Sequence, residues 1–305
     1  WQEVEQMSCE LSPSSGKVYG LERVCRVWSF PRSSFYSKRH AGNQTDLSRI
    51  VGKRGPKTEI SDERLLEAIK ADLEASPFTG EGHRKVYARL RILENIRVGK
   101  DRILRIMREN NILSPRRVRQ GAGKIHDGTI TTDAPNIMWG TDGTRIFTLE
   151  EGWVWIFTAV EHWNAECVGY HVCKTGNRYA ALEPIAMGLK HLYGSVDKEA
   201  ARGLSLRMDH GSQYLSDHFL NQIRFWGIHP SLAFVEEPQT NGVAERFNRT
   251  LKEQAIYGQI FKNTEDLRHA VATFVDHYNN HWRPEKLGYQ TPVEARNNFC
   301  LETAA

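Results

Sequence analysis

The order of strand-like and helical patterns in the second half restricts the fold of this chain more than any other feature. Apolar and polar residues alternate over residues 139–147, 152–162 and 165–174, which predicts three consecutive strands. The segment Thr141–Thr144 is expected to interrupt the first of them. Because short connections join these strands, we expect them to pair in antiparallel fashion.

Helical and strand-like segments alternate after these strands. Spacing of apolar residues predicts helices near 179–193 and 216–226, and short strands at 205–208 and around 231–234. Three antiparallel strands followed by this alternation predict an α/β protein with a mixed sheet covered by helices.

The front half is helical instead. Residues 1–16 show no periodicity, whereas short helices are expected from Tyr19 and from Arg32, forming either a small helix-turn-helix or a hairpin without DNA contact. Three further helices follow, the first capped by Ser61. The third, after Gly99, carries arginines that include Arg102 and Arg105, so it is either a DNA-reading helix or the solvated face of a plain bundle.

We therefore expect five segments along the chain. They are an N-terminal helical segment (1–45), a helix-turn-helix DNA-binding domain (58–113), a basic linker (114–135), a catalytic core (136–260) and a C-terminal helical extension (261–305). The linker is expected either to contact a phosphate backbone or to be merely solvated, and its relevant cations are Arg116, Arg117 and Arg119.

The charge is distributed unevenly, which indicates either a module that grips phosphates joined to one that acts on them, or an ordinary fluctuation of charge. Of the 305 residues, 1–135 hold 25 Lys and Arg against 17 Asp and Glu, a balance of +8, and the remainder holds 16 against 20, a balance of −4. No apolar run approaches the roughly 18 residues of a membrane span, so we expect a cytoplasmic protein. The five cysteines form no disulfide framework.

Three acidic residues, Asp142, Asp209 and Glu245, lie on separate predicted elements, the last two separated by 35 residues. Gathered in one cleft, three carboxylates would repel one another unless a multivalent cation neutralised them. Hard oxygen ligands select Mg²⁺ or Mn²⁺, and two such ions can activate a water or hydroxyl and steady a leaving oxygen in phosphoryl transfer. The alternative is three unrelated surface acids.

The helix that bears Glu245 has two distinct faces. Val243, Phe247 and Leu251 recur every four residues and should face the sheet. A polar stripe lies opposite them, consisting of Glu245, Asn248, Arg249 and Lys252. It suits either a phosphodiester along the helix or an ordinary solvated ion pair.

Taken together, these motifs resemble the catalytic domain of the retroviral-integrase superfamily. More closely, they look like the second-frame protein of bacterial transposases of the type named insertion sequence three. The resemblance covers about residues 60–298, and the segments that carry it are Trp139–Thr144, Asp209–Ser216, Asn241–Glu253, Tyr278–Asn279, Leu287–Tyr289 and Thr291–Pro292.

The resemblance implies a ribonuclease-H-like core and a DNA transposase that nicks the ends of its element and joins the 3′ hydroxyl to another phosphodiester. It implies two Mg²⁺ or Mn²⁺ ions held by Asp142, Asp209 and Glu245. The side chains that would position DNA are Lys252, Arg249, Asn248, Asn241, Gln213 and Tyr214. The partners implied are double-stranded DNA carrying terminal inverted repeats, target DNA, further copies of the chain and an upstream-frame protein, in a bacterial nucleoid.

Two features depart from that pattern. The family usually has an Arg and a His where Trp282 and Glu285 stand, with Arg283 one place late, and the chain has no coiled-coil heptads. It also begins at Trp1, as expected of a fragment, a processed end or a fusion. The alternatives are a retroelement integrase, which should have a zinc knuckle not apparent here, a ribonuclease H, and a catalytically silent DNA-binding protein.

Overall fold

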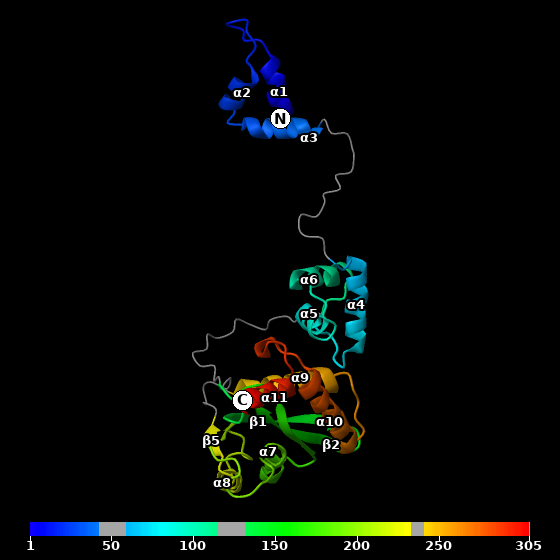
Figure 1. Cartoon of the computed structure of the whole chain (residues 1–305), viewed down its shortest axis with the longest axis vertical. Helices are drawn as coiled ribbons and strands as arrows, with labels where there is room; N and C mark the ends of the chain where they lie inside the picture. Colours follow the sequence, from blue (N-terminus) through cyan, green and yellow to red (C-terminus); the bar gives the residue numbers. More distant parts are fainter. Residues whose placement is uncertain (43–58, 115–131, 233–240, 305) are drawn as a thin grey trace. The chain divides into compact units, whose positions relative to one another are not determined.

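The computed structural model describes residues 1–42, 59–114, 132–232 and 241–304. The chain divides into two compact units, Trp1–Glu59 and Ile60–Ala305 (Figure 1). Within the described residues, no helix is long and apolar enough to cross a membrane.

The described part of the first unit, residues 1–42, contains three short helices, α1 (Gln2–Cys9), α2 (Leu21–Val27) and α3 (Arg32–Gly42). Two of them confirm the expectation of consecutive helices after Tyr19. The first was not expected, because only Val4 of α1 is fully buried, and a single buried position makes no periodic pattern. The small core consists of Val4, Val24, Cys25 and Phe35.

The second unit begins with three helices, α4 (Asp62–Ala75), α5 (His83–Ile92) and α6 (Lys100–Glu109). Ser61 caps α4 as predicted, since its hydroxyl accepts a hydrogen bond of 3.3 Å from the amide of Arg64. The predicted apolar positions meet in one cluster of Leu65, Ile69, Val86, Leu90, Ile103, Ile106 and Met107.

A five-stranded sheet follows, with strand order β3-β2-β1-β4-β5. Its strands are β1 (Met138–Thr148), β2 (Gly152–Glu161), β3 (Cys167–Cys173), β4 (Ser205–Met208) and β5 (His229–Leu232). The first three pair antiparallel, and β4 and β5 run parallel to β1. This confirms the predicted mixed, ribonuclease-H-like sheet preceded by all-α modules.

The predicted interruption of β1 is wrong, because the strand runs unbroken through Thr141–Thr144. Gly143 suggested a break, yet it pairs with Phe157 in the regular register. A Cβ at Gly143 would lie 2.7 Å from the ring of Phe157, so the glycine makes room for an aromatic residue on the neighbouring strand.

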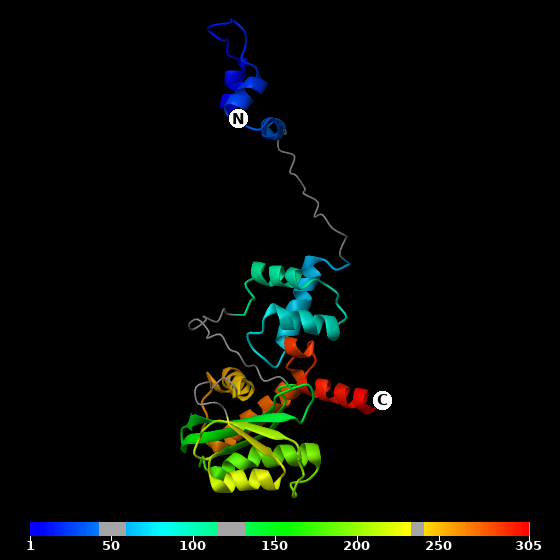
Figure 2. The ribbon, with the colours of Figure 1, turned by 90° about the vertical axis from the view of Figure 1, so that its left-hand side faces the viewer.

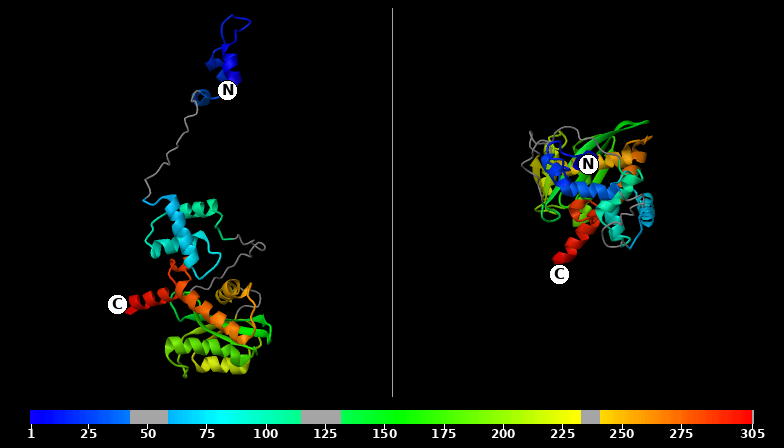
Figure 3. Two further views of the ribbon diagram at one scale, coloured as in Figure 1. Left: turned by 90° about the vertical axis from the view of Figure 1, so that its right-hand side faces the viewer. Right: turned by 90° about the horizontal axis from the view of Figure 1, so that it is seen from above.

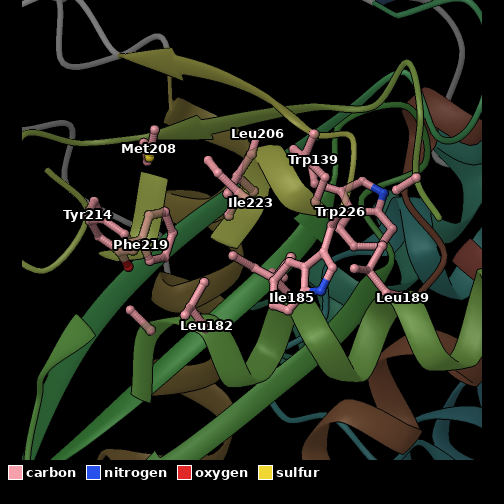
Figure 4. Packing of buried hydrophobic residues seen from close by; sticks show 14 of the residues in the cluster. Trp139, Leu182, Ile185, Leu189, Leu206, Met208, Tyr214, Phe219, Ile223 and Trp226 are labelled. Atoms are coloured by element: carbon pink, nitrogen blue, oxygen red, sulfur yellow. The ribbon is translucent and has the colours of Figure 1, made fainter. Parts of the chain in front are cut away.

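Helices cover both faces of this sheet (Figures 2 and 3). One face packs against α7 (Arg178–Tyr193) and α8 (Asp217–Phe225), and Figure 4 shows Trp139, Ile185, Leu206 and Ile223 within the core between them. The other face packs against α9 (Gly242–Leu251) and α10 (Thr264–His281), through a second cluster that includes Phe247 and Leu251. The middle of the sheet is therefore buried on both sides, as its apolar strands require.

Close approach fixes α7 on the sheet. A Cβ at Gly169 of β3 would lie 1.9 Å from the carbonyl oxygen of Pro184, within α7. Pro184 also removes one amide donor from the helix interior. Only a glycine lets the helix backbone lie this near the strand.

The described C-terminal part of the chain is helical. A π-helical turn over Lys252–Ile256 follows α9 directly, and α11 (Pro292–Ala304) ends the fold after a short 3₁₀ turn at Glu285–Leu287. The continuous helix assumed for the stripe from Glu245 to Lys252 thus changes its winding at Lys252.

Candidate active site

Asp142 lies in the middle of β1, just beyond the point where β4 stops pairing at Gly140. Its carboxylate accepts a hydrogen bond of 2.8 Å from the amide of Gly143 and one of 2.9 Å from the side-chain amide of Asn248 on α9. Two hydrogen bonds leave other lone pairs of this carboxylate available to a ligand.

Asp209 follows the last residue of β4, beside β1. Its carboxylate accepts a hydrogen bond of 2.8 Å from the amide of Gly211. A Cβ at Gly211 would lie 2.9 Å from that carboxylate oxygen and 2.5 Å from the side-chain nitrogen Nε2 of Gln213. The glycine therefore keeps the turn after β4 close to Asp209.

Glu245 is exposed on the first turn of α9. The helix is held against β1 at its start, where the side-chain amide of Asn241 donates a hydrogen bond of 3.0 Å to the carbonyl of Thr141. Thr141 directly precedes Asp142, so the contact connects the start of the Glu245 helix to the Asp142 strand.

The three acids affect one another electrostatically. Burial, followed by the charge of Asp209, raises the pKa of Asp142, while the hydrogen bond from Asn248 lowers it. Burial and the charges of Asp142 and Asp209 raise the pKa of Glu245, and Arg249 opposes them. Protein cations thus offset the shared negative charge only in part.

An open pocket of about 380 Å³ lies between β1 and α9. Its walls include two of the acids and two cations, and its full lining is Asp142, Gly143, Thr144, Glu245, Asn248, Arg249, Lys252 and Tyr257. Asp209 is not in the lining. In the described part of the chain, no three His, Cys, Asp or Glu side chains are gathered closely enough to hold a metal ion.

Several predicted DNA contacts have structural partners instead. Asn248 is only 4% exposed, and its side-chain oxygen accepts a hydrogen bond of 3.1 Å from Thr158. Asn241 is buried as well. Tyr214 is fully buried against Phe157 and Phe219, which removes it from the surface that DNA could contact.

The predicted cations divide into two groups. Lys252 and Arg249 line the pocket. By contrast, Arg102 donates to the carboxylate of Asp62 at 2.6 and 2.9 Å, and Arg105 donates to the same carboxylate at 2.6 Å. Arg116, Arg117 and Arg119 lie outside the described residues.

Sequence reasoning missed a contact between the α4–α5 loop and the catalytic core. The amide of Thr79 donates to the side-chain oxygen of Gln254 at 2.9 Å, and the side-chain nitrogen of Gln254 donates back to the carbonyl of Thr79 at 3.1 Å. Nearby, Phe78 packs edge-on against Trp282, whose ring also receives the ammonium of Lys85. The region of α4, α5 and α6 is therefore attached to the turn after α9.

The departures noted at Trp282 and Glu285 belong to this same contact. Glu285 accepts a hydrogen bond of 2.7 Å from Arg84 of α5. Arg283, which stands one place late, forms two hydrogen bonds of 2.7 Å with Glu294 on α11. Trp282 and Glu285 were the signal in the sequence that could have revealed this contact. A tryptophan and a charged residue at positions where the family usually has other residues together indicate a partner specific to this chain.

His162 lies beneath the start of α9. A Cβ at Gly140 would be 3.0 Å from the ring nitrogen Nε2 of His162 and 2.9 Å from the side-chain oxygen of Asn241. Burial lowers the pKa of His162 to about 4, so the ring is neutral at physiological pH. The absence of a side chain at Gly140 therefore leaves room for Asn241, at the start of α9, to pack against β1.

Two family models match parts of the chain. A model described as an integrase core domain matches residues 226–292, and one described as an HTH-like domain matches residues 61–120. The first includes α9 with Glu245, and the second includes α4, α5 and α6.

Curated relatives match more of the chain. The transposase for insertion sequence element IS629 of Shigella sonnei is 26% identical over 293 residues, which are 92% of this chain and 93% of that protein. Transposase InsD for insertion element IS2 of Escherichia coli is 26% identical over 240 residues, covering 72% of this chain and 78% of the relative.

Solved structures of retroviral proteins are similar at lower levels. A simian T-cell lymphotropic virus intasome in complex with the PP2A regulatory subunit B56 gamma has a TM-score of 0.44 at 16% identity, covering 75% of this chain and 74% of its own. The HTLV-2 integrase catalytic core domain in complex with magnesium has a TM-score of 0.39 at 16% identity, covering 54% and 98%. From the two family models and the curated relatives, we conclude that this chain is a homologue of bacterial insertion-sequence transposases, with an HTH-like region followed by an integrase core domain.

Proposed function

We propose that the protein is the DNA transposase of a bacterial insertion sequence, a polynucleotidyl transferase that cleaves DNA at the ends of its element and transfers the 3′ hydroxyl to another phosphodiester. One observation carries this proposal for the chain itself. Asp142 and Glu245 line one pocket together with Lys252 and Arg249, and Asp209 raises the pKa of both acids.

The residues present fit divalent metal ions in chemistry. All three acids offer hard oxygen donors, and their repulsion would be relieved by a cation such as Mg²⁺ or Mn²⁺. Asp142, Asp209 and Glu245 would hold two ions, which would supply Lewis-acid activation of the attacking oxygen and stabilisation of the leaving oxygen. The proposal requires the exposed side chain of Glu245 to turn towards the other two acids when the ions bind.

The chain's own side chains have distinct roles in this proposal. Asn248 holds the carboxylate of Asp142 in one orientation and favours its charged form. Lys252 and Arg249 line the same pocket as Asp142 and Glu245, where their charges suit a phosphodiester. Gln213, beside Asp209, would contact the same DNA strand.

The proposal also names partners and place. The substrates would be double-stranded DNA with the element's terminal inverted repeats and a target duplex. We infer that several copies assemble on DNA, and that an upstream-frame protein contributes to end recognition. A protein with these substrates would act at the nucleoid, in the bacterial cytoplasm.

The test is a cleavage and joining assay with the full chain, Mg²⁺ and DNA that ends in the terminal repeats. We expect Asp209→Asn and Glu245→Gln to abolish release and joining of 3′ ends while DNA affinity stays within about twofold. Glu183→Gln, a matched change at an exposed position of α7, should retain activity. Equal activity of the acid variants and the parent would refute the proposal and favour a catalytically silent DNA-binding protein.

A further inference from the structure

The central strand β1 has an open edge next to the pocket. Its parallel partner β4 pairs only with residues Met138–Gly140, whereas β2 accompanies β1 from Trp139 to Thr148. Within the described residues, the edge of β1 from Asp142 to Thr148 therefore has no strand beside it. An edge of this length normally needs something to cover it or a charge to protect it.

Two exposed aromatic rings lie at the far end of this edge. Phe147 of β1 is 55% exposed and Trp153 of β2 is 58% exposed, and their rings pack edge-on with centroids 5.6 Å apart. The guanidinium of Arg145 lies 5.7 Å from the Trp153 ring and 5.2 Å from the Trp155 ring. The surface thus presents π faces next to a cation.

The platform beneath these rings is fixed by packing. Trp155 stacks on Phe157 with ring centroids 5.4 Å apart and planes 4° from parallel. Gly176 also lies against Trp155, since a Cβ there would be 2.3 Å from the indole. A ring held in this way keeps Arg145 in place above it.

Both cations and acids lie near this end of the sheet. Lys174 directly follows β3. Arg178 is the first residue of α7, and its guanidinium lies over the ring of Tyr179. A helix N-terminus adds partial positive charge. The nearby acids Glu150 and Glu151 accept hydrogen bonds from Asn263 and Thr264, and Lys174 lies close enough to lower the pKa of Glu151.

The patch follows the pocket along β1 and lies on the other face of the sheet. Thr144 lines the pocket, and Arg145 is the next residue of the same strand. At about 3.3 Å per residue, Arg145 lies roughly 10 Å along β1 from Asp142. Because side chains alternate along a strand, Arg145 and Phe147 face the side of the sheet opposite Asp142. A DNA strand leaving the pocket would cross the open edge to reach them.

We propose that Arg145, Phe147 and Trp153, supported by Trp155, form a binding site for unpaired nucleotides of the DNA strand that enters the acidic pocket. The inference rests on the proposed function and deepens it. Exposed rings stack on bases only where the bases are not already paired within a duplex, and the guanidinium attracts the adjoining phosphates. The guanidinium of Arg145 at the exposed rings favours this polyanion over a second copy of the chain.

The experiment measures DNA affinity by fluorescence anisotropy, without metal, so that no cleavage is needed. The two probes are a blunt duplex and the same duplex with three unpaired nucleotides at one end. We expect the parent to prefer the unpaired end by about fivefold or more, as stacking on one aromatic residue allows. Trp153→Ala and Arg145→Gln should each lose that preference and bind the blunt duplex within about twofold of the parent.

Two controls separate stacking from general damage. Trp153→Phe keeps a ring and should retain most of the preference, and Phe225→Ala removes a similarly exposed ring on α8 and should change nothing. Three results would overturn the inference: no preference in the parent, an equal loss for both probes, or a change of sedimentation mass in Trp153→Ala that marks an interface between copies. The cleavage assay is separate, so loss of activity in the acid variants can stand while this inference fails.

Discussion

The side-chain amide of Asn248 donates a hydrogen bond of 2.9 Å to the carboxylate of Asp142. The other end of the same amide accepts a hydrogen bond from Thr158 of β2. Helix α9 is thus tied to two strands by one buried residue, and the position of Glu245 relative to Asp142 depends on it.

Loss of the Asn248 side chain should shift the pH dependence of cleavage. The hydrogen bond lowers the pKa of Asp142, which burial raises, so Asn248→Ala should raise that pKa further. Because the carboxylate form is needed, the acid limb of the pH–rate profile should move to higher pH, and the deficit should be larger at pH 6 than at pH 8.5.

The same substitution should cost about 1 to 3 kcal/mol in free energy of unfolding, because it leaves buried polar groups unpaired. Asn280→Ala, which removes an exposed amide bonded to Asp276, is the control for both measurements. A pH profile parallel to that of the parent would exclude the role of Asn248.

Neutralising Glu245 should stabilise the metal-free protein in a pH-dependent way. The folded pKa of Glu245 is raised, so the native state binds more protons than the unfolded state, and stability falls as pH rises from the unfolded pKa through the folded one. Glu245→Gln removes this effect, and its melting temperature should exceed that of the parent by about 2 °C at pH 8 and by less at pH 4.5. Differential scanning calorimetry in a chelating buffer measures the difference, and a larger gain at acid pH would contradict it.

Divalent cations should stabilise the protein through the acids. A ligand at 100 times its Kd adds about 2.7 kcal/mol to the free energy of unfolding. We expect Mg²⁺ or Mn²⁺ to raise the melting temperature, and Asp209→Asn to remove most of that rise. Glu183→Gln should respond like the parent. Identical responses of Asp209→Asn and the parent would show that the cation binds elsewhere.

Exposed cations on α6 should contribute to DNA binding more than the paired ones. Lys100 and Arg108 are exposed, whereas Arg102 is held by Asp62. Lys100→Gln and Arg108→Gln should each lower DNA affinity and reduce the salt slope by about 1. Arg102→Gln should lower the melting temperature with little change in that slope. A salt slope reduced only by Arg102→Gln would reverse this assignment.

The ring of Trp282 and the ammonium of Lys85 should show a measurable coupling. A cation–π contact in a partly buried place is worth about 0.5 to 2 kcal/mol. In a double-mutant cycle of Lys85→Ala and Trp282→Ala, followed by urea unfolding, the two losses should be non-additive by that amount. Strict additivity would show that the contact contributes nothing.

Sequence patterns predicted those elements whose burial is periodic. Val243, Phe247 and Leu251 face the sheet as their spacing indicates, and Ser61 begins α4. Local spacing could not reveal long-range partners. Asn248 belongs to the polar stripe by position, yet it is buried because Asp142 and Thr158, both distant in sequence, supply its hydrogen bonds.

The sequence predicted which residues form the candidate site and on which elements they lie, but it did not predict the distances between their side chains. Asp142, Asp209 and Glu245 stand on β1, after β4 and on α9, as expected, but their gathering around metal ions stays a prediction. Arg102 shows the limit of charge counting, since Asp62 lies 40 positions earlier and only the fold brings the two together. Tyr214 sits in a polar motif yet packs into the core, because the turn after Asp209 directs it inward.

The paired hydrogen bonds between Thr79 and Gln254 matter to anyone who wishes to retarget such an enzyme. A chimaera joined within residues 114–135 would import foreign recognition helices while keeping a π-helical turn shaped for the native loop. The donor's loop would then meet Gln254 and Trp282 without matching groups. Grafts that also exchange residues 76–85 and their counterparts at 254 and 282–285 should preserve the contact between the helices α4–α6 and the catalytic core.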